Sequence, residues 1–207
     1  MNKKVAIIDP LGAHGSSHHF YLFGQSIGLI KSGAEVALYT NKETVDPKIE
    51  GLDFITFYQD VFTSKFSIIN GLRWIIGSIR SILHARFSQI SIFHFHIFYT
   101  NILVLFNLLL VKVLFGKVVL TIHDVESFAN NSNTKILSDL VYKLTDLVLT
   151  HNNFSKLEII NRNPDLSAHI SIVPHGSYTS FINRRNDQKK SRDYLRLPTN
   201  KKIILFF

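Results

Sequence analysis

The sequence predicts an α/β protein with a mostly parallel β-sheet of about seven strands and helices on both faces. Strand-like and helix-like segments alternate from end to end, which is typical of right-handed βαβ units. The strand-like segments are rich in Val and Ile without strict alternation, as in strands that are covered on both faces. In addition, 46% of the 207 residues are hydrophobic, which is enough for one sizeable core.

The expected strands are aliphatic runs at residues 4–9, 35–40, 53–57, 90–95, 117–123, 146–150 and 169–173. The expected helices carry apolar residues at helical spacing and cover residues 17–32, 65–87, 98–115, 134–145 and 152–161. Segment 97–115 is the only candidate for a membrane span. Because polar residues interrupt it between two strands, we interpret it as a buried crossover helix.

The character of the chain changes after the last expected strand. Residues 176–201 are polar and basic, and residues 203–207 then form a new strand-like run. We therefore expect one domain over residues 1–175. Residues 176–207 are expected to be a linker followed by the first helix and strand of a second domain.

Charge and cysteine content limit the possible partners. The chain has no Cys, which excludes a disulfide framework and thiolate metal sites. Its formal net charge of +8 favours anionic lipid or phosphate-bearing ligands. No basic motif interleaved with aromatic residues is present, so we expect no nucleic-acid partner.

The expected helix 65–87 is amphipathic and basic. An apolar stripe from Ile68 to Leu83 is expected to face the core, with Arg73 and Arg80 on another face and Trp74 at the boundary. Such a helix can lie on an anionic membrane surface. We therefore expect a cytoplasmic protein attached peripherally to the inner face of the membrane. The alternative is an ordinary solvated helix face.

Histidines mark the ends of the expected strands. Five of the ten lie at or just beyond an apolar run: His14, His96, His123, His151 and His175. Ligands of open parallel sheets bind in the crevice outside the carboxyl ends of the strands. This pattern predicts a binding site along that edge.

The loop after the first strand carries a second signal. Gly12, His14, Gly15 and Ser16 lie between the strand and the first helix, where a glycine-bearing turn favours a phosphate or a sugar hydroxyl. A plain strand-to-helix turn is the alternative. No dinucleotide cofactor is expected, because residues 39–41 lack the acidic residue that would bind its ribose.

Metal binding by histidine is the weaker interpretation of the same residues. The candidates are His14, His18, His19, His94, His96 and His123, but no acidic cluster and no H-x-x-x-H helix pair accompanies them. We expect no metal ion and assign some of these side chains a structural role. Asp124, which follows His123, either sets its tautomer or caps the turn. Because neighbouring strand residues point to opposite faces, we expect no direct His–Asp catalytic dyad.

Several segments together resemble the N-terminal half of a family of enzymes, the retaining GT-B glycosyltransferases of family 4. They include the first strand and glycine loop, residues 5–15; the histidine strand, 93–96; the strand ending in His123 and Asp124; the Pro174-His175-Gly176 turn; and residues 195–207. The turn is similar to the family's Pro-Asn-Gly signal, with His175 in place of Asn.

The resemblance implies a Rossmann-like domain that receives a glycan or polyprenyl-linked acceptor, with the nucleotide-sugar donor bound by a second domain. It implies transfer of a sugar in bacterial surface polysaccharide synthesis. His123 would be the catalytic residue that contacts the donor sugar. Gly15 would lie near the donor phosphates or the acceptor.

The remaining candidate binding residues are Gly12, His14, Ser16, His96, Asp124, His151 and His175. Because the family's basic pair and carboxylates belong to the second domain, we expect this chain alone to be inactive. Two alternatives remain: a non-catalytic module that binds an acceptor or a membrane surface, and a sugar-nucleotide or metal-dependent enzyme that uses the histidines.

Overall fold

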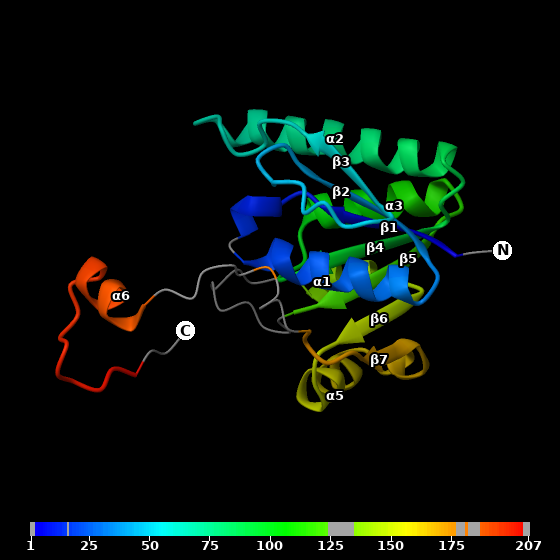
Figure 1. The fold of residues 1–207 in the computed structure, drawn as a ribbon. Helices are drawn as coiled ribbons and strands as arrows, with labels where there is room; N and C mark the ends of the chain where they lie inside the picture. The colour runs from blue at the N-terminus through cyan, green and yellow to red at the C-terminus, as the bar shows by residue number, and fades with distance from the viewer. Residues whose placement is uncertain (1–2, 16, 124–134, 177–180, 182–186, 205–207) are drawn as a thin grey trace. The chain divides into compact units, whose positions relative to one another are not determined.

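The computed structural model describes residues 3–15, 17–123, 135–176, 181 and 187–204 (Figure 1). Its contacts divide the chain into two compact units, Met1–Gly176 and Ser177–Phe207.

The first unit is built on one seven-stranded sheet in which every neighbouring pair is parallel. The strand order is β3-β2-β1-β4-β5-β6-β7. The strands are β1 (Lys4–Asp9), β2 (Glu35–Asn41), β3 (Leu52–Tyr58), β4 (Ile92–Ile97), β5 (Lys117–Ile122), β6 (Leu147–Thr150) and β7 (Ile170–Ile172). The predicted α/β fold is therefore confirmed.

Helices connect the strands. They are α1 (His18–Lys31), α2 (Ser67–Phe87), α3 (Ile102–Val113), α4 (Lys135–Lys143) and α5 (Asn153–Arg162), with short 3₁₀ helices η1 (Gly12–Gly15) and η2 (Pro164–His169). Side-chain caps fix two of the starts. The amides of Val104 and Ser155 donate to the side chains of Asn101 and Asn152. The helix expected from residue 98 therefore begins at Ile102.

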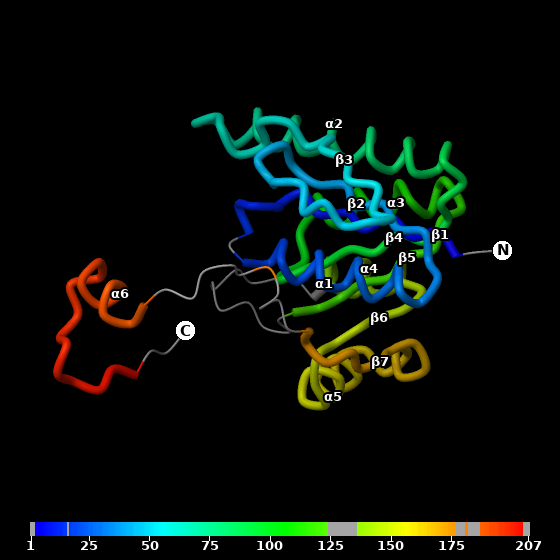
Figure 2. The backbone as a smooth tube through the Cα atoms, in the orientation of Figure 1, coloured from blue at the N-terminus to red at the C-terminus, as the bar shows by residue number. Residues whose placement is uncertain are grey.

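The two faces of the sheet differ in chemistry. α3 contacts both α2 and α4, and these helices cover the larger apolar core, which includes Phe93, Phe95 and Leu120. α1 lies in front of the sheet in the tube view (Figure 2). Because side chains alternate along a strand, His94 and His96 point away from the Phe93 and Phe95 face and toward the α1 face.

The strand order reverses beside β1. The chain leaves β1 toward β2 on one side, whereas the connections from β4 onward run in the opposite direction. In an open α/β sheet this switch point is where a crevice forms at the carboxyl ends of the strands. The loop after β1 and the ends of β4 and β5 therefore occupy the position expected of a ligand site.

Helix α2 packs on the sheet with a different face from the one predicted. Its buried residues are mostly small: Gly77, Ser78, Ser81, Ile82 and Ala85. A Cβ atom at position 77 would lie 2.5 Å from the ring of Tyr58, so glycine permits this close approach. The N-terminal part of the predicted core stripe is wrong, because Ile68, Leu72 and Ile76 are more than half exposed.

The second unit contains α6 (Gln188–Tyr194), which Asp187 caps by accepting the amide of Lys189 at 2.8 Å. Residues 201–204 form no strand, and the rest of the strand expected at 203–207 lies outside the described residues. Among the helices that the structure describes, none is long and apolar enough to cross a membrane.

Candidate functional site

The strand register brings the histidines of three strands to one edge. His96 pairs with Thr121 across β4 and β5, and Thr121 pairs with Leu149 across β5 and β6. His123 and His151 each lie two residues beyond these partners, so they emerge on the same face as His96. Although they are far apart in sequence, the three side chains meet beyond the ends of neighbouring strands.

Nitrogen–nitrogen contacts at hydrogen-bond distance join these three rings. Nδ1 of His96 lies 3.1 Å from Nε2 of His123, and Nδ1 of His123 lies 3.2 Å from Nε2 of His151. At one end Nε2 of His96 reaches the Gln25 side-chain oxygen at 3.0 Å, and at the other Nδ1 of His151 reaches the Val173 carbonyl at 2.9 Å. Both ring nitrogens of each histidine are therefore paired.

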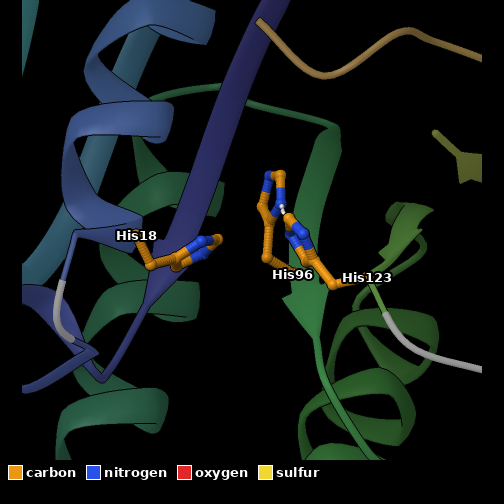
Figure 3. A group of neighbouring side chains, drawn as sticks. All are labelled: His18, His96 and His123. Carbon is orange, nitrogen blue, oxygen red and sulfur yellow. Dashed lines mark hydrogen bonds between the residues drawn. The ribbon is translucent and has the colours of Figure 1, made fainter. Parts of the chain in front are cut away.

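Helix α1 supplies the other wall of the cluster. His18, Tyr21 and Gln25 follow one another at helical spacing and face the strand ends. The His18 ring stands edge-on to His123 with centroids 4.9 Å apart. Figure 3 shows His18 extending from α1 toward His96 and His123. The Tyr21 ring lies 4.6 Å from His175, which brings the fourth strand-end histidine into the group.

Aromatic and histidine rings also hold the cluster from the strand side. The Phe98 ring stacks on His123 at 4.7 Å with 19° between the planes. His94, one layer deeper, stacks on His96 at 4.5 Å, and its Nε2 lies 2.8 Å from the Thr121 hydroxyl. These contacts fix the ring planes of His96 and His123 before any ligand arrives.

Three histidines of the cluster, His18, His96 and His123, are neutral at physiological pH. Burial, reinforced by repulsion from neighbouring histidines, lowers the pKa of His18 to about 4 and that of His123 to about 3. Burial likewise holds the pKa of His96 well below its usual value. Neutral imidazoles donate and accept hydrogen bonds and can ligate metal ions.

The glycine loop beside β1 is rigidly built. The Gly12 amide donates to Asp9 at 3.1 Å, and the Ala13 amide donates to the Thr44 hydroxyl at 3.0 Å. Gly12 has φ +48°, and a Cβ there would lie 2.0 Å from the Thr44 Oγ1 atom. Burial raises the pKa of Asp9 to about 6, although the Gly12 amide opposes that shift.

The structure separates the candidate residues into three groups. His96, His123, His151 and His175 are together. Gly12 is buried and supports the loop, whereas the His14 ring points elsewhere, 4.7 Å from Phe62 and 3.8 Å from the Glu43 carboxylate. Ser16 and Asp124 lie outside the described residues.

Sequence reasoning named His18 only as a candidate metal ligand in the first loop, and it missed Tyr21, Gln25 and Phe98. His18, Tyr21 and Gln25 occupy one face of α1 at spacings of three and four residues, a signal that was present in the sequence. Gly15, the last residue of η1, has Leu11 close to it, since an added Cβ would lie 3.2 Å from the Leu11 Cβ atom.

The side chains expected to face a membrane make contacts within the protein. Arg73 donates to the Asp60 carbonyl at 2.9 Å and to the Thr63 hydroxyl at 3.0 Å. The Arg80 guanidinium lies 4.8 Å above the Phe57 ring, and the Trp74 ring is 6.2 Å from Tyr58. The outer surface of this helix is instead apolar, formed by Phe66, Ile68, Leu72 and Ile76.

The chain matches no family model and no curated protein. Its fold, however, matches solved structures of GT-B glycosyltransferases. Sucrose-phosphate synthase from Thermosynechococcus elongatus aligns with 96% of this chain at a TM-score of 0.64 and 14% identity. The catalytic domain of starch synthase IV from Arabidopsis thaliana aligns with 98% of it at 0.63 and 13%.

MurG from Acinetobacter baumannii aligns with 84% of the chain at a TM-score of 0.53 and 10% identity. The alignments cover 54% of the sucrose-phosphate synthase chain, 61% of the starch synthase chain and 46% of the MurG chain, so this chain spans about half the length of these proteins. At such identities the likeness concerns the fold, and the chain has the Rossmann-like α/β fold found in GT-B glycosyltransferases.

Proposed function

We propose that this chain is the acceptor-side half of a retaining GT-B glycosyltransferase. The whole enzyme would transfer a sugar from a nucleotide-sugar donor to a glycan or lipid-linked acceptor in bacterial surface polysaccharide synthesis. The observation that carries the proposal is the position of the histidine cluster. It lies beyond the carboxyl ends of β4 to β7, beside the strand-order switch and the N-terminal end of α1.

The chemistry of the cluster fits a carbohydrate. Sugars present many hydroxyls and flat apolar faces, and the site offers neutral imidazoles together with the rings of Tyr21 and Phe98. In this proposal His123 exchanges a hydrogen bond with a neighbouring histidine for one with a sugar hydroxyl. Its low pKa keeps it a neutral hydrogen-bond partner, so it does not serve as a cationic acid.

In the proposed retaining reaction, stabilisation of the departing diphosphate matters more than a dedicated base. A diphosphate carries away negative charge, and fixed donors that face this charge stabilise the transition state. The proposal assigns that task to a second domain together with the backbone near Gly15. The chain alone is accordingly proposed to bind an acceptor without transferring sugar.

The test is a transfer assay on the protein with and without the coding sequence that follows Phe207. Radiolabelled UDP-, GDP- and ADP-sugars are offered with lipid-linked and free glycan acceptors. The proposal requires transfer by a form that carries a nucleotide-sugar-binding second domain, with the anomeric configuration of the donor kept in the product. Absence of a second domain in the continued reading frame, or an inverted product, would contradict it.

A second candidate comes from another structural likeness. UDP-GlcNAc 2-epimerase from Methanocaldococcus jannaschii aligns with 82% of this chain at a TM-score of 0.54 and 14% identity. This supports a sugar-nucleotide enzyme that rearranges its substrate without an acceptor. Conversion of a nucleotide sugar in the absence of any acceptor, followed by proton NMR, distinguishes this candidate from the transferase.

We also propose attachment to an anionic membrane surface through α2. The exposed residues Ile68, Leu72 and Ile76 form a ridge along this helix, and Phe66 lies just before it. The α2 sequence contains Arg73, Arg80 and Arg86 and no acidic residue. An apolar ridge on a helix whose charged residues are all basic is complementary to the headgroup region of an anionic bilayer.

A further inference from the structure

Three histidine nitrogens converge between β4, β5 and α1. One ligand atom each from His18, His96 and His123 lies within 4.8 Å of the others. Figure 3 shows the three rings turned toward a common region from three separate elements. A tetrahedral ion with metal–nitrogen bonds of about 2.0–2.1 Å holds its ligand atoms ~3.3 Å apart. The 3.1 Å between His96 and His123 is close to that separation.

The hydrogen bonds at the two ends of the histidine chain determine which nitrogens carry protons. The Val173 carbonyl can only accept, so His151 donates to it from Nδ1. The other nitrogen of His151, Nε2, then accepts, and His123 donates to it from Nδ1. At the other end the Gln25 side-chain oxygen accepts from Nε2 of His96.

These assignments leave two lone pairs facing each other. A neutral imidazole has one N–H, and both His96 and His123 have used theirs on the outer partners. Nδ1 of His96 and Nε2 of His123 then meet at 3.1 Å with no proton between them. A positive charge at this place would remove the repulsion between the two lone pairs.

We propose that this position binds a divalent transition-metal ion of the zinc class, with His18, His96 and His123 as ligands. The His18 ring moves inward by about 1 Å to complete three-nitrogen coordination. Gln25 and His151 fix the tautomers by accepting from the outer N–H groups, as partners of metal-bound histidines do. This proposal differs from the expectation, drawn from the sequence, that no metal ion binds. The proposed metal site does not depend on the proposed sugar transfer.

A metal at this position has an open coordination site. Three neutral ligands leave the ion with its full double charge and with room for water or for an oxygen atom of a ligand. Histidine-only coordination by neutral rings favours zinc, copper and nickel over magnesium and calcium, which prefer oxygen ligands. The ligand class that follows is an oxygen donor such as a phosphate or a sugar hydroxyl pair.

Metal binding is tested on the full chain after removal of metals with a chelator. Zn²⁺ is titrated by calorimetry, and Co²⁺ by its visible absorption, which reports the coordination geometry. We expect one ion per chain and a rise in melting temperature, because an ion that binds only the folded state stabilises it. No saturable one-to-one binding by folded wild-type protein would overturn the proposal, whatever the variants do.

Four variants test the ligand assignment. His96→Gln and His123→Gln should each weaken Zn²⁺ binding by more than about 100-fold, and His18→Gln by at least about tenfold. His169→Gln is the matched control, because His169 is exposed in η2 and remote from the cluster in sequence. Unchanged affinity in folded His123→Gln protein, or equal losses in His169→Gln protein, would contradict the site.

Variants of Gln25 distinguish the metal site from a metal-free chain of hydrogen bonds through the same histidines. If its amide were turned, the NH₂ group would donate to Nε2 of His96, and the three neutral rings would pass their protons along the chain without any ion. Gln25→Glu can only accept, so metal binding predicts equal or tighter Zn²⁺ affinity. A fall of about tenfold or more in Zn²⁺ affinity in folded Gln25→Glu protein would instead support the metal-free chain.

Discussion

The Nε2 atom of His123 lies 3.1 Å from Nδ1 of His96, a residue 27 positions earlier in the sequence. Since His151 occupies the other nitrogen of the His123 ring, a ligand reaches this ring only by replacing a protein partner. Stacking on Phe98 keeps the plane of the ring fixed during that exchange. His123 is thus oriented before binding, which is the condition for a strong contribution to transition-state stabilisation.

In the proposed glycosyltransferase, His123→Ala should therefore reduce sugar transfer by about 10²-fold, the scale of losing one well-placed donor. The free energy of unfolding should fall by only about 1 kcal/mol, because the lost hydrogen bonds are individually weak. Transfer assays and urea unfolding on the same preparations measure both effects.

His169→Gln serves as the control for loss of a histidine, because this side chain is exposed. Near-normal transfer by well-folded His123→Ala protein would exclude the catalytic assignment. A parallel loss of stability and activity would instead indicate a structural histidine.

Gly12→Ala should lower the free energy of unfolding by about 2–4 kcal/mol. The added methyl would combine a left-handed backbone with a 2.0 Å contact to Thr44. Thr44 cannot turn away freely, because its hydroxyl accepts from the Ala13 amide and donates to Asn41 at 2.9 Å.

Gly28→Ala is the matched substitution. Gly28 lies within α1, and an added Cβ there meets nothing within 4 Å. Its replacement should raise stability by about 0.5–1 kcal/mol through helix propensity. Urea unfolding of both variants measures the contrast, and equal effects would show that the Gly12 loop is not tightly held.

Strand prediction succeeded because aliphatic runs buried on both faces leave a clear signal, and each strand end was placed within two residues. The faces of the helices were harder to predict. Helical periodicity identified an apolar stripe on α2, but the side of α2 that meets the sheet depends on Tyr58 in β3. The bulky Tyr58 ring leaves room only for Gly77, and its hydroxyl lies 3.2 Å from Ser78. The pattern of α2 alone contains no information about Tyr58, because Tyr58 lies on a different element.

Only part of the site was predicted from the sequence. Position at a strand end identified His96, His123, His151 and His175, since strand ends share one edge of a parallel sheet. The same rule misplaced His14, because η1 turns its ring toward Phe62. Gln25 was missed, and His18 was named only as a possible metal ligand, because their places beside His96 depend on how α1 packs against β4, which no local pattern records.

Asp9 should make stability depend on pH in a window between about pH 4 and 6. Its pKa rises from 3.8 in the unfolded chain to about 6 in the fold, a difference of about 2 pH units. A raised carboxyl pKa contributes stability that is complete below pH 3.8 and is lost as the pH rises through 6. Asp9→Asn keeps an acceptor for the Gly12 amide without the buried charge.

The variant should match the wild type near pH 4 and exceed it by up to about 3 kcal/mol above pH 6. Urea unfolding of both proteins between pH 4 and 7.5 measures this difference. The buried histidines have lowered pKa values and act in the opposite sense, but they are common to both proteins and cancel. A difference that does not change with pH would place Asp9 in contact with solvent.

Attachment through α2 should appear as co-sedimentation with anionic vesicles at low salt. Each Lys or Arg near such a surface contributes roughly 1 kcal/mol, and the exposed ridge adds apolar insertion. Because screening shortens to about 3 Å at 1 M salt, high salt should release most of the protein. Vesicles with and without phosphatidylserine, each at low and high salt, separate the electrostatic contribution from that of apolar insertion.

The double variant Leu72→Ser and Ile76→Ser should reduce binding several-fold, since both side chains are more than half exposed on the ridge. Phe154→Ser is the control, because Phe154 is equally apolar and exposed but belongs to α5. Equal binding to neutral vesicles, or no binding to anionic vesicles at low salt, would contradict membrane attachment. Dimerisation of the wild type that the double variant abolishes, detected by light scattering, would identify the ridge as a protein interface instead.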